Sequence, residues 1–275
     1  MDGALSAGGQ ENNAVSLFRY RDAALSLALL NLRLRYNNTL IGAAWSLVNP
    51  LFFMLIFTFV FSVLLPNDTP DFPVFVLSAL LAWNYFQAAI SNAAISVTNG
   101  RGLVLKIAFP RAVLPLAAIL TELVTFSLAL SVVVGVLYLS GRGLGAGLLA
   151  LPLLVLLLTV LVVGIGLGLA ALNVRLRDTQ EFLSVFLFGW FFMTPILYRL
   201  ESIPAERELL GISARAFVQV INPLSPLITA FRQAIYEQRF PDLALLGSAA
   251  LSALVLFVGG VVIFGRASRT FAETL

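Results

Sequence analysis

A series of long apolar runs constrains this chain more than any other feature. Of its 275 residues, 60% are hydrophobic and only 11% are charged, and the mean hydropathy is +0.96. A lipid bilayer offers the backbone no hydrogen-bonding partner, so only helices or closed barrels cross it. The runs here are continuously apolar and approach the 20 or so residues that a spanning helix needs. The sequence therefore predicts an all-α integral membrane protein.

We expect six transmembrane helices, with an interfacial helix before them and short re-entrant helices on the outer side. The expected spans are Ala44–Leu65, Pro73–Val97, Ala112–Leu139, Leu144–Leu172, Phe182–Tyr198 and Leu243–Phe264. The expected organisation is a flexible N-terminal tail (1–14), an interfacial amphipathic helix (15–43), the six-span domain (44–265) and a C-terminal tail (266–275).

Basic residues favour a cytoplasmic location for both termini. The opening stretch is polar and rich in glycine, and it lacks the isolated apolar core of a signal peptide. With both termini inside, eleven of the 17 basic residues fall on the cytoplasmic side and six on the outer side, as the excess of Lys and Arg in cytoplasmic loops requires. The first outer loop, PNDTPD, contains two aspartates and no basic residue.

The composition disfavours several kinds of chemistry. The chain has no His and no Cys, so it lacks an imidazole base, a thiol nucleophile and the usual zinc ligands. Its one lysine, Lys106, is followed by Ile107 rather than by the Ser or Thr of a phosphate-binding loop. The glycines at 164, 166 and 168 lie inside an apolar run, where they favour close helix packing over nucleotide binding. We expect no metal site, no cofactor, no nucleic-acid binding and no ATP hydrolysis by this chain alone.

Two basic segments are expected on the cytoplasmic side. The stretch NGRGLVLKIAFPR, Asn99–Arg111, is short, basic and bounded by glycine, which indicates a small amphipathic helix. Between Leu17 and Thr39, four arginines flank the apolar LSLALLNL. This pattern is typical of a helix that lies at the inner leaflet with its arginines near lipid phosphates, although an ordinary juxtamembrane anchor would have the same pattern.

Four segments, in chain order, carry a resemblance to a known family. They are LRLRYNNTLIGAAWSLVNPLFFMLIFTFVFS (Leu32–Ser62), NGRGLVLKIAFPR, NVRLRD (Asn173–Asp178) and INPLSPLITAFRQAIYE (Ile221–Glu237). The chain resembles the membrane subunit of ABC-type polysaccharide exporters, the family that moves lipid-linked O-antigen or teichoic acid chains. Together the four segments cover most of the sequence.

The resemblance implies a half-transporter of a bacterial cytoplasmic membrane. Two copies would form one pore, and two copies of a separate ATP-binding subunit would bind ATP and magnesium. The residues implied in coupling to that subunit are Asn99, Arg101, Lys106, Phe109, Pro110, Arg111, Arg175, Arg177 and Asp178; those implied in the interfacial helix are Arg33, Arg35, Tyr36 and Trp45. Without the resemblance, both basic loops could be simple topology signals with no partner.

Aromatic residues are the candidates for a channel lining. Phe53, Phe57 and Phe61 recur at every fourth residue and so share a helical face. Trp83, Tyr85 and Phe86 lie near the middle of the second span, away from the headgroup level where aromatic belts usually sit. Sugar rings stack on flat aromatic faces, so these residues could guide a glycan. Packing between helices explains the same pattern.

Glu122 is the one acid expected well inside a span, roughly 15 Å from its cytoplasmic edge at 1.5 Å per residue. Because a buried charge is costly, it either lines the pore or ties its helix to a polar neighbour.

The outer segment, about 199–242, should contain a helix capped by Ser225 with Pro226 in its first turn. The resemblance implies that this helix closes the outer mouth of the pore with Phe231 and Tyr236, while a plain surface cap is the alternative.

The sequence favours export of a lipid-linked polysaccharide over three rivals. An exporter of lipids or small amphiphiles from the same superfamily is the nearest. A membrane-embedded glycosyl- or phosphotransferase normally needs clustered acids or metal ligands at the membrane face, whereas most acids here are scattered over outer loops. A secondary transporter is disfavoured because charges within spans are rare and no repeated half is evident.

Overall fold

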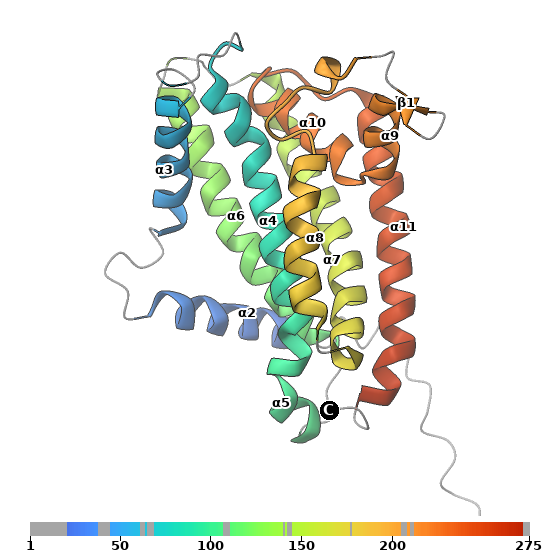
Figure 1. Cartoon of the computed structure of the whole chain (residues 1–275). Coiled ribbons are helices and arrows are strands. Elements are labelled where there is room, and N and C mark those ends of the chain that lie inside the picture. The colour runs from blue at the N-terminus through green and yellow to red at the C-terminus, as the bar shows by residue number, and fades with distance from the viewer. Residues whose placement is uncertain are drawn as a thin grey trace, which may run out of the picture.

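The structure is a bundle of long helices with a shorter helix lying across one end (Figure 1). This computed structural model describes residues 21–37, 45–60, 64, 69–106, 111–139, 141, 145–176, 178–204, 208–209 and 212–271. The helices in the first half are α2 (Arg21–Tyr36), α3 (Trp45–Phe59), α4 (Phe72–Asn99), α5 (Arg101–Lys106) and α6 (Val113–Leu139). Those in the second half are η3 (Ala146–Ala150), α7 (Leu151–Arg175), α8 (Thr179–Met193), η4 (Leu200–Ser202), α9 (Ala214–Ile221), α10 (Leu224–Ile235), α11 (Leu243–Ala267) and η5 (Ser268–Thr270). A two-residue antiparallel hairpin, β1 (Glu208–Leu209) with β2 (Ile212–Ser213), precedes α9.

Four helical segments in the described part of the chain are long and apolar enough to cross a membrane: α4, α6, α7 with η3, and α11 with η5. They match four of the six predicted spans, and the predicted all-helical class is confirmed apart from the small hairpin. The other two predicted spans correspond to α3 and α8, which have 15 residues each. At 1.5 Å per residue, 15 described residues span about 22 Å, less than the 30 Å or so of a hydrocarbon core, and the residues directly beyond both ends of the stretch 45–60, which contains α3, lie outside the described residues.

Helix α4 is the centre of the bundle. Most of its side chains are buried, and it contacts α6 and α7 along its length and also α3, α8 and α10. Its first half is almost entirely apolar, as expected of a helix surrounded by other helices, whereas Asn84 and Gln87 near its middle are polar and exposed. Helix α11 is peripheral, because it packs mainly on α7 and leaves most of its other side chains exposed.

Glycines allow α7 and α11 to pack so closely that their backbones are in contact. A Cβ atom at Gly164 would lie 2.5 Å from the backbone of Leu256 and Phe257, and one at Gly260 would lie 2.6 Å from the carbonyl carbon of Gly164. Gly166 faces the other way, where a Cβ would meet Ala93 and Ile119 at 3.1 Å. The prediction that Gly164 and Gly166 serve helix packing is confirmed, whereas Gly168 has open space around it.

Two predicted boundaries are wrong. Helix α8 ends at Met193 rather than Tyr198, because Pro195 has no N–H and its ring forces Thr194 into an extended conformation. Helix α10 begins at Leu224, before Ser225, so Ser225 does not cap it. The cap comes instead from Asn222, whose side-chain oxygen accepts a hydrogen bond from the backbone N–H of Leu224 at 3.0 Å.

The ends of the bundle differ in character. Helix α2 lies across one end of the bundle, the same end at which α5 lies and α11 finishes, whereas the hairpin, α9 and α10 lie at the other end (Figure 1). Ala24 and Ala28 form the buried face of α2, which packs on α6. Leucines on its other faces are exposed: Leu25, Leu29, Leu30 and Leu34. We use "inner end" for the end with α2 and α5, and "outer end" for the other.

Candidate functional site

The predicted coupling segment forms a sharp corner at the inner end. Helix α4 ends at Asn99, and α5 begins at Arg101 after the single residue Gly100. A Cβ at Gly100 would lie 2.7 Å from the side chain of Leu114, so glycine permits the start of α6 to pack against this corner. Asn99 and Arg101 are exposed. The guanidinium of Arg111 lies 5.9 Å from the ring centre of Phe271, the last described residue.

Part of this segment lies outside the described residues. Lys106 is the last residue of α5, with no described side chain, and neither Phe109 nor Pro110 is described. The expected helix over 99–111 therefore corresponds to a described helix of six residues, Arg101–Lys106.

The loop after α7 lies at the same end. Arg175 is the last residue of α7 and is exposed, as is Asp178 before α8, while Arg177 lies outside the described residues. Asn173 is buried and donates a hydrogen bond from Nδ2 to Thr98 Oγ1 at 3.2 Å. This bond joins the inner ends of α7 and α4, two residues before the corner at Gly100. The bond could not be predicted, because nothing in the sequence relates Asn173 to Thr98.

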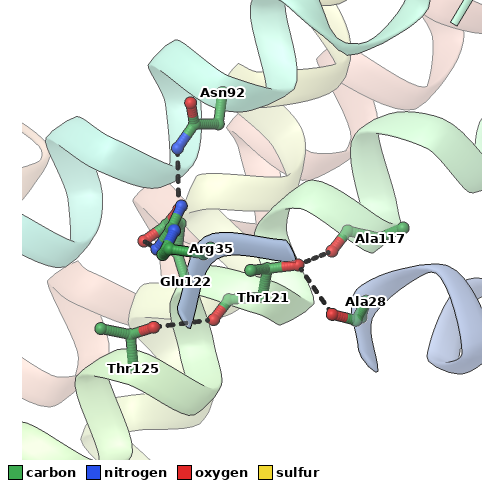
Figure 2. A network of polar contacts seen from close by, with 7 residues as sticks. All are labelled: Ala28, Arg35, Asn92, Ala117, Thr121, Glu122 and Thr125. Carbon is green, nitrogen blue, oxygen red and sulfur yellow. Dashed lines mark hydrogen bonds and ion pairs between the residues drawn. The ribbon is translucent and has the colours of Figure 1, made fainter. Parts of the chain in front are cut away.

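A polar network at the inner end joins α2, α4 and α6 (Figure 2). Glu122 of α6 is only 5% exposed, and both of its oxygens accept hydrogen bonds from the guanidinium of Arg35, one of them at 3.1 Å. Asn92 of α4 donates to the same carboxylate at 2.7 Å. A bidentate, charge-assisted pair of this kind fixes the relative orientation of the two side chains as well as the distance between them. The hydrogen bonds to Glu122 raise the pKa of Arg35 above its ordinary value, so the guanidinium stays charged at any physiological pH.

A second set of contacts in the network holds α2 against α6. Thr121 Oγ1 bonds to Ala117 O at 2.8 Å and reaches Ala28 O of α2 at 3.5 Å. Thr125 donates to Thr121 O at 3.2 Å. Helix α2 is thus attached to the bundle at Arg35, through the ion pair, and near Ala28, where small residues allow close approach (Figure 2).

The structure gives Glu122 the polar neighbours that the tie proposed from sequence requires. Those neighbours, Arg35 and Asn92, are 87 and 30 residues away in sequence, so no local pattern reveals them. Of the other residues expected in the interfacial helix, Arg33 is exposed and Tyr36 is half-buried on α2. Trp45 is the first residue of α3, with its side chain outside the described part.

A cavity of about 400 Å³ adjoins the network. It lies between α2, α4, α5 and α6, and its walls contain both the Arg35–Glu122 pair and the corner residues Asn99 and Gly100. The polar network and the coupling corner therefore border one space at the inner end.

The candidate channel aromatics fall into two groups. Trp83, Tyr85 and Phe86 of α4 are each at most 3% exposed and pack on other helices of the same chain. Tyr85 stacks on Phe126 with ring centres 4.8 Å apart and donates to Thr159 at 3.1 Å. Phe86 meets Trp190 edge to face, and Trp83 meets Phe191 in the same way.

The aromatic face of α3 is open. Phe53 is 38% exposed, and its neighbours Phe52 and Phe59 are more exposed still. The side chain of Phe57 and the whole of Phe61 lie outside the described residues. Of the two candidate groups, the one on α3 has described aromatic side chains that are partly exposed, whereas the one on α4 is buried.

The two candidate gate residues do not share a surface. Phe231 of α10 is 1% exposed and meets Phe126 edge to face at 6.1 Å, so it belongs to the core of the bundle. Tyr236, at the end of α10, is half-buried and donates from its hydroxyl to Pro70 O at 2.7 Å.

Comparison with known proteins gives consistent matches over nearly the whole chain. A profile of the ABC-2 type transporter family matches residues 24–236. The O-antigen export system permease protein RfbA of Myxococcus xanthus is 33% identical over 261 residues, which cover 94% of this chain and 97% of that protein. A protein of the same name from Klebsiella pneumoniae is 26% identical over 246 residues, covering 89% of this chain and 92% of that protein. The family match runs from α2 to the end of α10, so it includes the coupling corner, the polar network and most of the outer segment.

Proposed function

Because this chain belongs to the ABC-2 type transporter family, we propose that it is the membrane permease of an ATP-driven exporter of lipid-linked polysaccharide. The observation that carries the substrate class is the 33% identity to an O-antigen export permease over 94% of this chain and 97% of the relative. The match extends over nearly the whole length of that relative rather than over one shared module. The proposed location is the bacterial cytoplasmic membrane, with the inner end of the bundle and both termini on the cytoplasmic side.

The proposed energy source is a separate ATP-binding subunit, present in two copies, that holds the ATP and magnesium. The permease lacks a phosphate-binding loop, so hydrolysis is assigned to the partner. Helix α5 is the proposed contact, because it projects at the inner end (Figure 1) and carries Arg101 exposed. Arg175 and Asp178, exposed at the same end, are a second proposed contact, together with Arg177.

The polar network provides a route for movement from α5 to α2. Asn92 lies seven residues before the end of α4 at Asn99, about 10 Å along the helix axis at 1.5 Å per residue, and only Gly100 separates α4 from α5. A displacement of α5 therefore moves Asn92, and Asn92 is hydrogen-bonded to the carboxylate that holds Arg35. We assign Glu122 the role of a tie that makes α2 follow α4 and α6, since packed elements with fixed polar contacts move as units.

The proposed pore lies between two copies of the chain, each with six spans. Helices α3 and α8 complete the six, and both carry large exposed apolar side chains, including Phe52 and Phe53 on α3 and Phe182 and Phe188 on α8. A second copy or lipid must cover such surfaces, because exposed apolar patches of this size mark interfaces. The aromatic face of α3 is the proposed glycan-facing surface, whereas the buried Trp83, Tyr85 and Phe86 pack on α6, α7 and α8.

The experiment that tests this function uses purified protein with and without the partner ATPase. The isolated permease should hydrolyse no ATP, and the two proteins together should form a stable complex whose hydrolysis is stimulated by lipid-linked polysaccharide. Stimulation by phospholipid alone would favour the exporter of lipids or small amphiphiles. Sustained hydrolysis by the isolated permease, with contaminating ATPases excluded, would refute the half-transporter.

A further inference from the structure

The cavity at the inner end has one polar wall and one apolar wall. It measures about 400 Å³ and lies between α2, α4, α5 and α6, which is within the range of about 300–1,000 Å³ that ordinary ligand sites have. The polar wall includes Asn31, Arg35 and Asn99, and the apolar wall includes Leu30 and Leu103. Both leucines are also exposed at the surface of the chain. A ligand that contacts both walls must itself be amphiphilic.

The polar wall offers mainly hydrogen-bond donors. Arg35 uses two of the five N–H groups of its guanidinium in the bonds to Glu122, and 38% of its side chain remains exposed. Within the described part of the chain, the side-chain amides of Asn31 and Asn99 make no hydrogen bond to another residue.

The negative charge in this wall is hidden. Of the described residues that line the cavity, Glu122 alone carries a carboxylate, and only 6% of its side chain is exposed. The groups that a ligand can reach are therefore a guanidinium and two amides. A guanidinium with neighbouring N–H donors is the usual protein partner of a phosphate group.

The position of the cavity sets its depth in a membrane. Helix α2 exposes Leu25, Leu29 and Leu34, as expected of a helix at the boundary between lipid headgroups and acyl chains. Helix α5 lies further from the outer end of the bundle than α2 does (Figure 1). The cavity between them therefore extends from this boundary into the headgroup layer, where the phosphates of a bilayer lie.

We propose that this cavity binds one phospholipid of the adjacent leaflet by its phosphodiester group. Arg35, Asn31 and Asn99 donate to the phosphate oxygens, and the first part of an acyl chain lies against Leu30 and Leu103. Because Glu122 neutralises much of the charge of Arg35, a phosphodiester with a single negative charge fits better than a more highly charged phosphate. The proposal requires only that the chain lies in a membrane, and it does not depend on what the permease exports.

The bound lipid would connect two elements that border the cavity. Asn31 belongs to α2, and Asn99 is the last residue of α4, directly before the corner at Gly100. The protein contacts that hold α2, at Arg35 and near Ala28, are mainly with α6. A phosphate held by both asparagines therefore adds an attachment between α2 and the coupling corner.

The first test measures protection of the cavity wall from chemical labelling. The chain has no cysteine of its own, so Ser96→Cys places a single thiol in the wall. Ser91→Cys is the matched control, because Ser91 is half-buried on the same helix and does not line the cavity. Each variant is purified in detergent without its ATPase, delipidated, and treated with a maleimide in the presence or absence of dioleoyl phosphatidylethanolamine.

Bound lipid and maleimide compete for the same space at position 96. Saturating phospholipid should therefore slow labelling there by about fivefold or more, and labelling at position 91 by less than about 1.5-fold. Equal slowing at the two positions, or no slowing at position 96, would overturn the proposal.

Two further additives identify the group that is recognised. A diglycosyl diacylglycerol has the acyl chains without a phosphate, and inorganic phosphate has the anion without the chains. Neither should slow labelling of Ser96→Cys by more than about 1.5-fold. Protection by the glycolipid equal to that by the phospholipid would refute phosphate recognition, and protection by inorganic phosphate would assign the cavity to a soluble anion instead.

A last comparison tests the proposed donors. In the Ser96→Cys background, Asn31→Leu should reduce the protection by phospholipid to less than about twofold. Asn37→Leu is the matched control, because Asn37 is an exposed asparagine directly after α2 that does not line the cavity, and it should leave the protection unchanged. Both positions are exposed, so neither change should unfold the permease. Full protection in the Asn31→Leu variant would contradict the assigned phosphate contact, whereas the proposed export function would stand, since polysaccharide and ATPase take no part in the assay.

Discussion

Replacing Gly260 by alanine should separate α7 from α11. The Cβ atom added at position 260 would lie 2.6 Å from the carbonyl carbon and 2.9 Å from the Cα of Gly164, with the carbonyl oxygen closer still. All three atoms are backbone, so no side-chain rotation relieves the contact. Ordinary contact distances require the helices to move apart by about 1 Å, which forfeits a quarter to a half of each dispersion contact along the crossing. We expect a loss of about 3 kcal/mol, the upper end of the usual cost of overpacking.

The adjacent Gly259 is the matched control. A Cβ there meets nothing within 4 Å, and alanine within a helix is favoured over glycine by about 0.5–1 kcal/mol. Gly259→Ala should therefore be neutral or slightly stabilising, so the two neighbouring substitutions should differ in sign. The assay is denaturant unfolding of the purified permease in detergent, with folded fraction followed by tryptophan fluorescence. Equal stability of the two variants would refute the glycine crossing.

Three further predictions concern the inner end and the pore. Arg35→Met should destabilise the permease by about 2–3 kcal/mol in the same unfolding assay, because it leaves the buried Glu122 carboxylate without its charge partner, while the exposed Arg33→Met should cost less than about 0.5 kcal/mol. Joint charge reversal at Arg101, Lys106 and Arg111 should leave the protein folded but weaken co-purification of the ATPase, although single changes should be silent at about 0–1 kcal/mol each; normal assembly and export by the triple variant would contradict the coupling role. Phe53→Leu should lower export of polysaccharide without lowering the amount of folded protein, and wild-type export would show that Phe53 only packs.

The long helices of this protein are predictable from sequence, because their cause is local. Twenty or more consecutive apolar residues meet the bilayer requirement by themselves, and α4, α6, α7 and α11 fall within a few residues of their predicted bounds. The packing role of Gly164 was predictable for a related reason, since a glycine inside a spanning run has few other uses.

Other features depend on partners far away in sequence. The start of α10 was misplaced because Ser225 and Asn222 are both good capping residues, and only the position of α8 decides that Asn222 caps α10. The error at the end of α8 was avoidable, since Pro195 is visible in the sequence and disfavours helix at the residue before it. The partner of Glu122 was not predictable, because Arg35 lies on a helix that crosses the bundle end at an angle set by tertiary packing.

The sequence also does not predict the burial of Trp83, Tyr85 and Phe86. An aromatic residue in the middle of a span is compatible with a channel, a lipid face or a core, and the choice depends on which helices surround α4. Packing between helices is one of the two explanations that the sequence allows for these residues, and the structure shows their packing contacts with α6, α7 and α8.

The most direct test of the central claim is transport by a reconstituted complex. The permease and its ATPase are placed in proteoliposomes with fluorescently labelled lipid-linked polysaccharide in the outer leaflet and the ATPase facing outward. After addition of ATP and magnesium, the account predicts that the glycan becomes protected from an added glycosidase, and that neither protein alone gives protection. Accumulation of protected glycan without ATP, or hydrolysis by the complex with no protection of glycan above the level of empty liposomes, would contradict it.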